Sequence, residues 1–339
     1  MSATTMVEAA EMTETMKGWG AEGKGSAEVL RFRDVAKPEV TDGRVLVKVR
    51  ASSVNAADYH GLHGGWIVNV IGKLMRMGPP PAVLGGDVAG IVEAVGKDIT
   101  AFRVGDEVCG SGRGSWAEYT TGTERSLVKK PKNVPFEEAG AIGVASMTAL
   151  QGLRDKGELK AGQRVLIFGA GGGVGTFAVQ IAKALGAHVT AVTGPRTIDL
   201  VRPLGADVLI DYSTEDVKRR GERYDVIFDV AATRSIGYLR SMLVPDGILV
   251  LAGAPKSGGF AMIFAHLIAS MFRARVLKQR VRFYIASINA KDLAFITDLM
   301  AAGKVRTVID RTFPFSETRE AVRYAEKGMG RAKVVITVD

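Results

Sequence analysis

Residues 164–196 constrain the fold more than any other part of the chain, because they predict a strand, a glycine-rich turn, a helix and a second strand. The short apolar run at 165–168 is typical of a buried parallel strand. Glycines then recur at every third position, at Gly169, Gly172 and Gly175, and lead into apolar residues at helical spacing. Such a unit binds a dinucleotide, since glycines let the backbone approach a pyrophosphate at the helix N-terminus.

The end of the second strand bears on the choice of cofactor. NAD-binding units usually carry Asp or Glu there, which accepts a hydrogen bond from the ribose 2′-hydroxyl. Here the strand ends in Thr193-Gly194-Pro195-Arg196, and Asp199 falls inside the next predicted helix. A carboxylate would repel a 2′-phosphate, whereas Thr193 and Arg196 can donate hydrogen bonds to one. This strand end therefore favours NADPH over NADH, with a solvated arginine in a first helical turn as the alternative for Arg196.

Composition narrows the class of protein. A chain of 339 residues is long for one domain, and 47% hydrophobic content is enough for a sizeable core. The single cysteine, Cys109, excludes an internal disulfide framework and a multi-cysteine zinc site. The net charge of +9 does not indicate nucleic-acid binding, because the cations are mostly scattered and no aromatics are interleaved with them.

The N-terminus and the hydropathy pattern bear on location. Acidic residues, and no Lys or Arg, precede Lys17, which is unlike a secretory signal or a transit peptide. No apolar run reaches about 18 residues, the length needed to span a bilayer. We therefore expect a cytoplasmic protein without a membrane span, in which residues 1–14 form a flexible extension.

Two kinds of secondary structure follow one another along the chain. The segments 28–32, 44–51 and 90–95 are strand-like and separated by turns, without long helices, which predicts a mostly antiparallel region. From about residue 135 onward, helical stretches alternate with short apolar strands, which predicts a doubly wound parallel sheet. The tail from residue 305 returns to strands and one helix.

Nine segments carry a family resemblance: VKVRASSVNAADY, GGDVAGIVEAVG, FRVGDEVCG, SWAEYTTG, EEAGAIGVASMTAL, GQRVLIFGAGGGVGTFAVQIAKALGA, LGADVLIDY, YDVIFDVA and RAKVVITV. In this order they resemble the zinc-independent medium-chain dehydrogenases/reductases, in the quinone oxidoreductase or zeta-crystallin-like branch. The resemblance implies an α/β fold, with a Rossmann doubly wound parallel sheet inserted in a GroES-like, mostly antiparallel β domain. It places the catalytic domain at 15–143 plus 304–339 and the NADP(H)-binding domain at 144–303, and it implies a homodimer.

The same resemblance bears on zinc. Metal-binding members carry a catalytic cysteine where this chain has Asn55, a His-Glu pair where Asp87 stands, and a lobe of four cysteines that is missing here. Zinc needs three or four Cys, His or carboxylate ligands on converging elements. His60 and His63 have only Cys109 as a soft partner near them in the sequence. We expect no metal.

Without a metal to hold an alkoxide, conjugated hydride acceptors become the better substrates, because they spread the developing charge themselves. The chain is therefore predicted to be an NADPH-dependent, zinc-independent oxidoreductase that transfers hydride to a quinone or an α,β-unsaturated carbonyl. Two alternatives stay open. One is an NAD(P)-dependent alcohol or ketone dehydrogenase, and the other is a non-enzymatic cofactor-binding or membrane-peripheral protein.

The loop after the strand at 44–51 supplies the candidate catalytic residues. The resemblance places Asn55 where the family contacts the nicotinamide ribose or the substrate, with a loop-capping asparagine as the alternative. Tyr59 is able to donate its hydroxyl hydrogen to a substrate carbonyl, or it packs on the β domain. The candidates for the substrate pocket are His60, Trp66 and Phe283.

The candidate cofactor-binding residues lie at the glycine turn, at strand ends or at family positions: Thr148, Gly169, Gly172, Val174, Gly175, Thr193, Arg196, Tyr212, Ala252, Gly253 and Lys333. The resemblance places Thr148 near the nicotinamide, unless its hydroxyl bonds back to its own helix. It places Tyr212 near the adenosine phosphate, and Lys333 by the cofactor phosphate unless it is a surface lysine. Ala252 and Gly253 end a strand and should face the nicotinamide.

The segment 260–282 departs from the general pattern. Residues 260–272 are largely apolar and residues 273–282 are basic. Four uses stay open: lining the substrate pocket, packing against a dimer partner, lying on an anionic membrane as an interfacial helix, or forming an ordinary amphipathic helix with a solvated basic face. Pocket and dimer rank ahead of the membrane.

Overall fold

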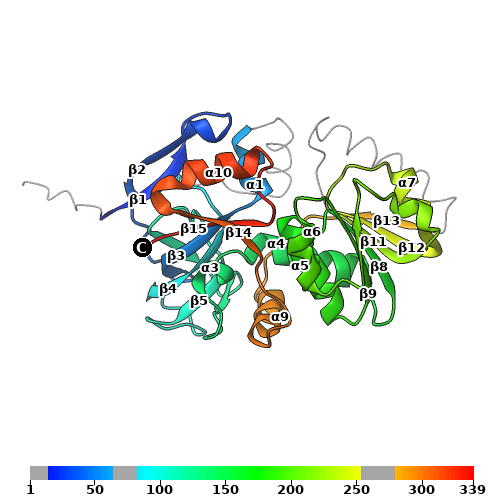
Figure 1. Cartoon of the computed structure of the whole chain (residues 1–339). Helices are drawn as coiled ribbons and strands as arrows, with labels where there is room; N and C mark the ends of the chain where they lie inside the picture. Colours follow the sequence, from blue (N-terminus) through cyan, green and yellow to red (C-terminus); the bar gives the residue numbers. More distant parts are fainter. Residues whose placement is uncertain (1–13, 64–81, 253–278) are drawn as a thin grey trace, which may run out of the picture.

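The computed structural model describes residues 14–63, 82–252 and 279–339, and two large sheets organise this part of the chain (Figure 1). The first sheet has the order β14-β15-β3-β4-β5-β7, with β6 paired to β3, and nearly all its pairs are antiparallel. Its strands are β3 (Val45–Val54), β4 (Asp87–Val95), β5 (Glu107–Ser111), β6 (Tyr119–Gly122), β7 (Leu127–Lys129), β14 (Ile309–Pro314) and β15 (Lys333–Thr337).

The two ends of the described chain meet on this sheet. The C-terminal strand β15 pairs antiparallel with β3, and Figure 1 shows β14, β15 and α10 beside the N-terminal strands. The hairpin of β1 (Thr15–Ala21) and β2 (Leu30–Ala36) packs nearby. The helices of this part are α1 (Ala56–His63), α3 (Phe136–Ala139) and α10 (Thr318–Glu326), with short 3-10 turns at Ala27–Val29 and Phe315–Glu317.

The second sheet is entirely parallel, with the order β10-β9-β8-β11-β12-β13. Its strands are β8 (Arg164–Phe168), β9 (His188–Thr193), β10 (Val208–Asp211), β11 (Tyr224–Asp229), β12 (Leu243–Leu251) and β13 (Arg280–Phe283). The helices are α4 (Gly143–Leu150), α5 (Gly173–Ala184), α6 (Ile198–Val201), α7 (Ile236–Arg240) and α9 (Ala290–Ala301), with short helical turns at Gln151–Lys156, Arg202–Leu204 and Val217–Arg220. The predicted fold class, a GroES-like β domain with a Rossmann-like parallel sheet, is confirmed.

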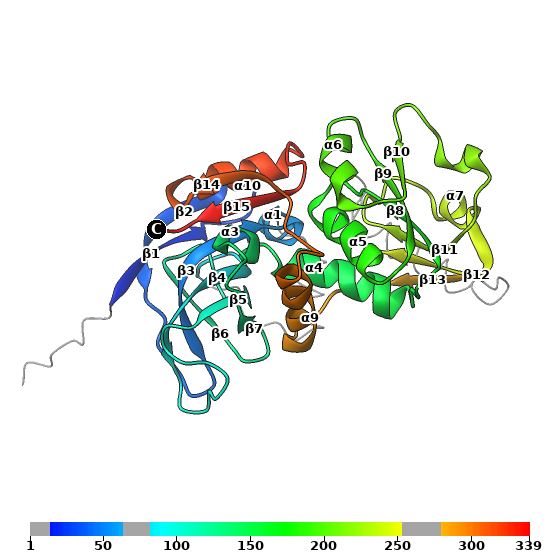
Figure 2. The same ribbon diagram turned by 60° about the horizontal axis from the view of Figure 1, so that its bottom comes forward.

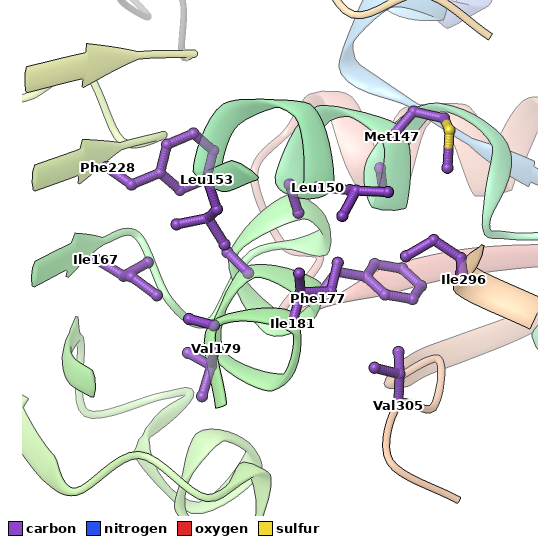
Figure 3. Packing of buried hydrophobic residues seen from close by; sticks show 14 of the residues in the cluster. Met147, Leu150, Leu153, Ile167, Phe177, Val179, Ile181, Phe228, Ile296 and Val305 are labelled. Atoms are coloured by element: carbon purple, nitrogen blue, oxygen red, sulfur yellow. The ribbon is translucent and has the colours of Figure 1, made fainter. Parts of the chain in front are cut away.

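One apolar cluster spans the space between the sheets. Figure 2 shows α4 and α9 between them. Figure 3 shows Leu150 and Phe177 towards Ile296 of α9, and Leu153 of the same cluster towards Phe228. The same cluster includes Cys109 of β5, so it reaches the first sheet as well. Because one core joins both sheets, the residues at their junction are held by continuous packing.

Some predictions fall partly or wholly outside the described residues. The extension at 1–14 is described only at Glu14, and the exact domain boundaries stay predictions. Of the apolar and basic segment 260–282, the end that is described forms β13 rather than a helix, and Arg280 and Arg282 both pair with Glu158, at 2.9 and 2.6 Å. An amphipathic helix is therefore wrong for residues 280–282. Within the described ranges, no helix is long and apolar enough to cross a membrane.

Candidate active site

The glycine turn connects β8 to α5 and depends on its glycines for close backbone packing. Gly169 has a φ of 79°, a left-handed conformation that side chains disfavour. A Cβ on Gly175 would lie 2.1 Å from the Gly169 carbonyl oxygen. Gly172 is the N-cap of α5 and adds no side-chain hydrogen bond, so the first N–H groups of the helix are left to an anion. Val174 is half-buried against the core. These residues fit a dinucleotide pyrophosphate.

Two threonines close the other side of the turn. Thr193 ends β9, and its hydroxyl lies 2.5 Å from that of Thr197. A Cβ on Gly171 would come within 2.3 Å of the Thr197 hydroxyl and 2.6 Å of the Thr193 hydroxyl. Thr193 is therefore buried under the turn and engaged with Thr197, and its role at a 2′-phosphate stays a prediction. The sequence analysis missed Thr197, whose only signal is its place at the start of the helix after β9.

The ends of β9 and β10 bring together the residues predicted near the adenosine. Arg196 is exposed, and its Nη2 donates to the Gly328 carbonyl at 3.2 Å. The hydroxyl of Tyr212 lies 2.6 Å from the position that a Cβ on Gly194 would take. The tyrosine therefore covers Gly194, the residue that follows β9. Asp211, opposite Thr193 in the adjacent strand, was not considered from the sequence. Its carboxylate accepts from the N–H and the hydroxyl of Ser213, at 2.8 and 2.7 Å.

A buried polar cluster forms where β3 ends and where β4 and β15 begin. These ends meet because β3 runs antiparallel to both neighbours. Asp87 is central to the cluster. Its Oδ2 accepts from the Ser53 hydroxyl at 2.7 Å and from Asn55 Nδ2 at 3.0 Å. Lys333 Nζ donates to Asn55 Oδ1 at 2.6 Å and lies 3.4 Å from Asp87 Oδ2. Each charged group therefore has partners, as burial requires.

Asp87 also connects the cluster to the parallel-sheet part of the chain. Its Oδ1 accepts from the Val144 N–H at 2.8 Å, in the first turn of α4. The N-cap residue of that helix, Ile142, has no side chain able to do this. A Cβ on Gly143 would lie 2.4 Å from Asp87 Oδ1, so glycine is needed for the approach. The carboxylate thus caps α4 from another element.

Lys333 is the member of the cluster that the sequence described least well. Its side chain is only 2% exposed, so the alternative of a surface lysine is wrong. The Cδ atom lies 3.0 Å from where a Cβ on Gly173 would be, at the start of α5. Lys333 thus touches the helix that would bind the phosphates, but its ammonium points to Asn55 and Asp87 instead. Its place by the cofactor phosphate stays a prediction.

Asn55 directly precedes α1, but its side chain does not cap this helix. Instead, Asp58 Oδ2 accepts from the Asn55 N–H at 2.7 Å, the carboxylate half of a capping box. The loop-capping alternative is therefore wrong for the Asn55 side chain. Burial raises the pKa of Asp58 to about 7, helped by the charge of Asp87 and opposed by the Asn55 N–H and by Lys333. A partly protonated carboxyl at neutral pH thus lies beside the cluster.

The other predicted residues of the substrate side lie along α1 and β13. Tyr59 is half-buried in the catalytic part, 4.8 Å from the His60 ring, and burial raises its pKa. Burial lowers the pKa of His60, which favours its neutral form. Phe283 of β13 is half-buried and pairs with Leu251 of β12. Trp66 lies outside the described residues.

The remaining predicted cofactor residues lie along α4 and at the end of β12. The Thr148 hydroxyl donates to the Val144 carbonyl at 2.8 Å, so it bonds back to its own helix, which was the structural alternative. The Thr148 carbonyl accepts from the Tyr284 hydroxyl. Ala252 is half-buried after β12. Gly253 lies outside the described residues.

The cluster does not fit zinc. In the described ranges, no group of three or more His, Cys, Asp and Glu side chains is placed to hold a metal. Among the described residues, the positions where the family's metal ligands would stand hold the Asp87 carboxylate and the Asn55 carboxamide, and Lys333 donates to both. A cation next to an ammonium loses the attraction that would hold it.

Comparisons with known proteins now identify the family. A model of the alcohol dehydrogenase GroES-like domain matches residues 41–132, and one of zinc-binding dehydrogenases matches residues 204–336. The 2-methylene-furan-3-one reductase of Solanum lycopersicum is 32% identical over 99% of this chain and 84% of its own length. The chain belongs to the medium-chain dehydrogenase/reductase superfamily.

Two further relatives refine this assignment. The chloroplastic NADPH-dependent alkenal/one oxidoreductase of Arabidopsis thaliana is 31% identical over 96% of this chain and 81% of its own length. The solved quinone oxidoreductase from Coxiella burnetii has a TM-score of 0.82 and 28% identity, and the match covers 96% of this chain and all of that one. The protein is therefore an oxidoreductase enzyme with a nicotinamide cofactor.

Proposed function

We propose that this protein is an NADPH-dependent, zinc-independent reductase of quinones or α,β-unsaturated carbonyls. The observation that carries the proposal is the buried cluster of Asn55, Asp87 and Lys333, in which Asn55 keeps one Nδ2 hydrogen for a ligand, while Asp87 and Lys333 pair with each other and leave no set of metal ligands. Such a site suits an acceptor that spreads negative charge by its own conjugation. The relatives named as quinone and alkenal/one reductases support the same substrate class.

The cofactor side of the proposal rests on the glycine turn and on Arg196. The first N–H groups of α5 bind the pyrophosphate, and glycine at 169 and 175 lets the turn and the start of the helix pack closely enough to present them. Arg196 is exposed next to Tyr212 at the end of β9 and donates to the 2′-phosphate of NADPH. When bound, the nicotinamide supplies a hydride from C4.

On the substrate side, the protein contributes hydrogen bonds to the acceptor oxygen. Asn55 Nδ2 keeps one hydrogen beyond its bond to Asp87, and the Tyr59 hydroxyl has no partner among the described residues. Each well-placed donor contributes about 2–4 kcal/mol to the stability of a developing oxyanion. That is adequate for a quinone or an enone and too little for an unactivated ketone.

The test compares matched acceptors. NADPH oxidation is followed with a quinone, with an enone and with the saturated ketone of the same skeleton. We expect kcat/KM for the conjugated acceptors to exceed that for the saturated ketone by about a hundredfold or more, which corresponds to about 2.7 kcal/mol of barrier. A saturated ketone reduced equally well would instead make the protein an alcohol or ketone dehydrogenase. NADPH binding without any turnover would make it a non-enzymatic cofactor-binding protein.

Chelation provides a second test of the same proposal. Because Lys333 donates to the side chains that stand where metal ligands would, we expect activity to survive dialysis against EDTA. Stoichiometric zinc by elemental analysis, with activity lost on its removal, would contradict the proposal. The homodimer and the cytoplasmic location also remain proposals, to be checked by light scattering and by localisation of a tagged protein.

A further inference from the structure

The orientation of the Asn55 carboxamide is fixed by two unlike partners. An ammonium group can only donate, so Lys333 Nζ at 2.6 Å requires the oxygen of the amide on its side. A carboxylate can only accept, so Asp87 Oδ2 at 3.0 Å requires the amino group on the other side. A flipped amide would place donor against donor and acceptor against acceptor. Asn55 therefore has one orientation.

The two partners also change what Asn55 offers to a ligand. Lys333 draws electron density towards Oδ1, which weakens that oxygen as an acceptor for anything else. Asp87 takes one Nδ2 hydrogen, so the other Nδ2 hydrogen is the group that Asn55 has left for a ligand. Asn55 thus presents itself to a neighbouring oxygen as a donor. An asparagine in water would offer both functions equally.

The partners are themselves held in place by the fold. The Ser53 hydroxyl and the Val144 N–H, at 2.7 and 2.8 Å, fix the two oxygens of Asp87. The stem of Lys333 lies against Gly173 at the start of α5, and its Nζ also lies 3.4 Å from the Val54 carbonyl. Little side-chain freedom remains to be lost when a ligand binds, so the arrangement is preorganised.

We propose that Lys333 and Asp87 are positioning residues that hold the Asn55 carboxamide as a hydrogen-bond donor towards the oxygen of the hydride acceptor. The inference rests on the proposed reductase function, because it assigns the role of a residue pair in that reaction. It goes beyond that function by placing the origin of the donor in a buried ion pair rather than in Asn55 alone.

A double-mutant cycle tests whether Lys333 acts through Asn55. We expect Asn55→Ala and Lys333→Met each to lower kcat for the enone at least about tenfold, which corresponds to about 1.4 kcal/mol, while the Kd of NADPH changes less than about threefold. The double variant should lose no more than Asn55→Ala alone. Losses that multiply would mean that Lys333 acts independently of Asn55, and would overturn the proposal.

Two further variants guard against loss of folding. Lys333→Met leaves Asp87 as an unpaired buried charge, whereas Lys333→Gln keeps a neutral donor for Asn55 Oδ1 and should restore part of kcat. The matched control is Lys183→Met, which removes the ion pair to Asp207, 2.8 Å long, on the parallel sheet. This control should leave kcat unchanged. A loss in Lys183→Met as large as in Lys333→Met would contradict a specific role.

Nuclear magnetic resonance gives a readout that does not depend on turnover. The chain has only four asparagines, Asn55, Asn69, Asn133 and Asn289, so selective 15N labelling yields a simple side-chain spectrum. The signal lost in Asn55→Ala identifies Asn55. We expect the chemical shifts of its two amide protons to differ from those of an exposed asparagine in the wild type, because both ends of the amide are hydrogen-bonded, and to move towards the exposed values in Lys333→Met. The Asn133 and Asn289 signals should not move.

The final arm adds an acceptor analogue to the same samples. With NADP+ and the unreactive saturated ketone at saturating concentration, one Asn55 amide proton should shift downfield in the wild type and not in Lys333→Met. An unmoved signal in an active wild-type enzyme would overturn the positioning proposal. If the signal shifts but quinones and enones are not reduced, the reductase proposal fails and the donor role of Asn55 stands.

Discussion

Asp58 is the residue at the site whose ionisation is altered most by the fold. Its carboxyl holds the Asn55 N–H and faces Asp87 and Lys333, and burial raises its pKa from 3.8 to about 7. In the unfolded chain it ionises near pH 4, so between about pH 4 and pH 7 folding takes up a proton. Its contribution to stability therefore falls as pH rises through this window, and is constant above it.

The variant Asp58→Asn removes this titration and keeps an acceptor for the Asn55 N–H. We expect the Tm of the variant minus that of the wild type to increase from about pH 5 to about pH 8, because only the wild type loses stability over that range. Differential scanning calorimetry at several pH values measures the difference, and all other titrating groups cancel between the two proteins. A difference independent of pH would mean that Asp58 is ionised throughout.

Arg196 is the residue that we propose selects NADPH over NADH. We expect Arg196→Ala to weaken NADPH binding by about 1–3 kcal/mol, the range for a charge-assisted hydrogen bond, with little effect on NADH. Isothermal titration calorimetry with each cofactor measures both. The control is Arg202→Ala, an exposed arginine that pairs with Asp199 at 3.9 Å. Equal affinity of the native protein for both cofactors would contradict the assignment.

The site residues differ in how far the sequence predicts them. Asn55 was found because the family resemblance marks its position, and Gly169 and Gly175 because their spacing has a local physical reason. Lys333 lies 278 positions from Asn55, and its burial depends on β15 pairing with β3. No local pattern reveals such pairing. Thr197 was missed for a similar reason, since only the folded turn brings it against Gly171.

At the scale of elements, the glycine turn makes the sharpest prediction. In Gly175→Ala, the added methyl group would lie 2.1 Å from the Gly169 oxygen and 2.7 Å from the Ala170 Cα, so the turn must open. We expect a lower Tm and loss of cofactor binding. Gly237→Ala in α7 is the matched control, because no atom lies within 4 Å of its added Cβ. It should retain binding and be as stable as the wild type or slightly more stable.

Element boundaries were predicted less well than element types. The stretch expected to be helical near residues 137–154 is divided into α3 and α4, followed by a π-helical turn. The division falls at Gly140, where a Cβ would lie 2.8 Å from the backbone of Ala51, so the chain must pass close to β3 there. The strand β1 was not anticipated at all, because its residues do not alternate between polar and apolar. Both features depend on tertiary contacts rather than on propensity.

At the scale of the whole molecule, contacts between the two sheet-bearing parts converge near the cofactor site. Asp87 of β4 caps α4, Arg196 after β9 donates to Gly328 after α10, and Lys333 of β15 lies beside the start of α5. One apolar cluster lies behind them. Binding to the parallel sheet should therefore stabilise the catalytic part as well.

The three tryptophans allow this coupling to be measured. Trp19, Trp66 and Trp116 all precede β8 in the sequence, and Trp19 and Trp116 are buried in the catalytic part. The fluorescence of Trp19 and Trp116 therefore reports on unfolding of that part, and Trp66→Phe removes the contribution of the third tryptophan. NADP+ at about 100 times its Kd stabilises the state that binds it by about 2.7 kcal/mol. We expect it to raise the urea midpoint seen by tryptophan fluorescence as much as that seen by circular dichroism.

The control is Gly175→Ala, in which NADP+ should shift neither midpoint because the turn no longer binds it. A tryptophan midpoint that NADP+ leaves unmoved, with a separate second transition in circular dichroism, would mean that the two parts unfold independently. Coincident shifts would mean that the junction transmits the binding free energy, since the proposed NADP+ site is on the parallel sheet while Trp19 and Trp116 lie in the other part. The buried ion pair of Asp87 and Lys333 would then have two roles. It would orient the Asn55 side chain, and it would help both sheets to unfold in one cooperative transition.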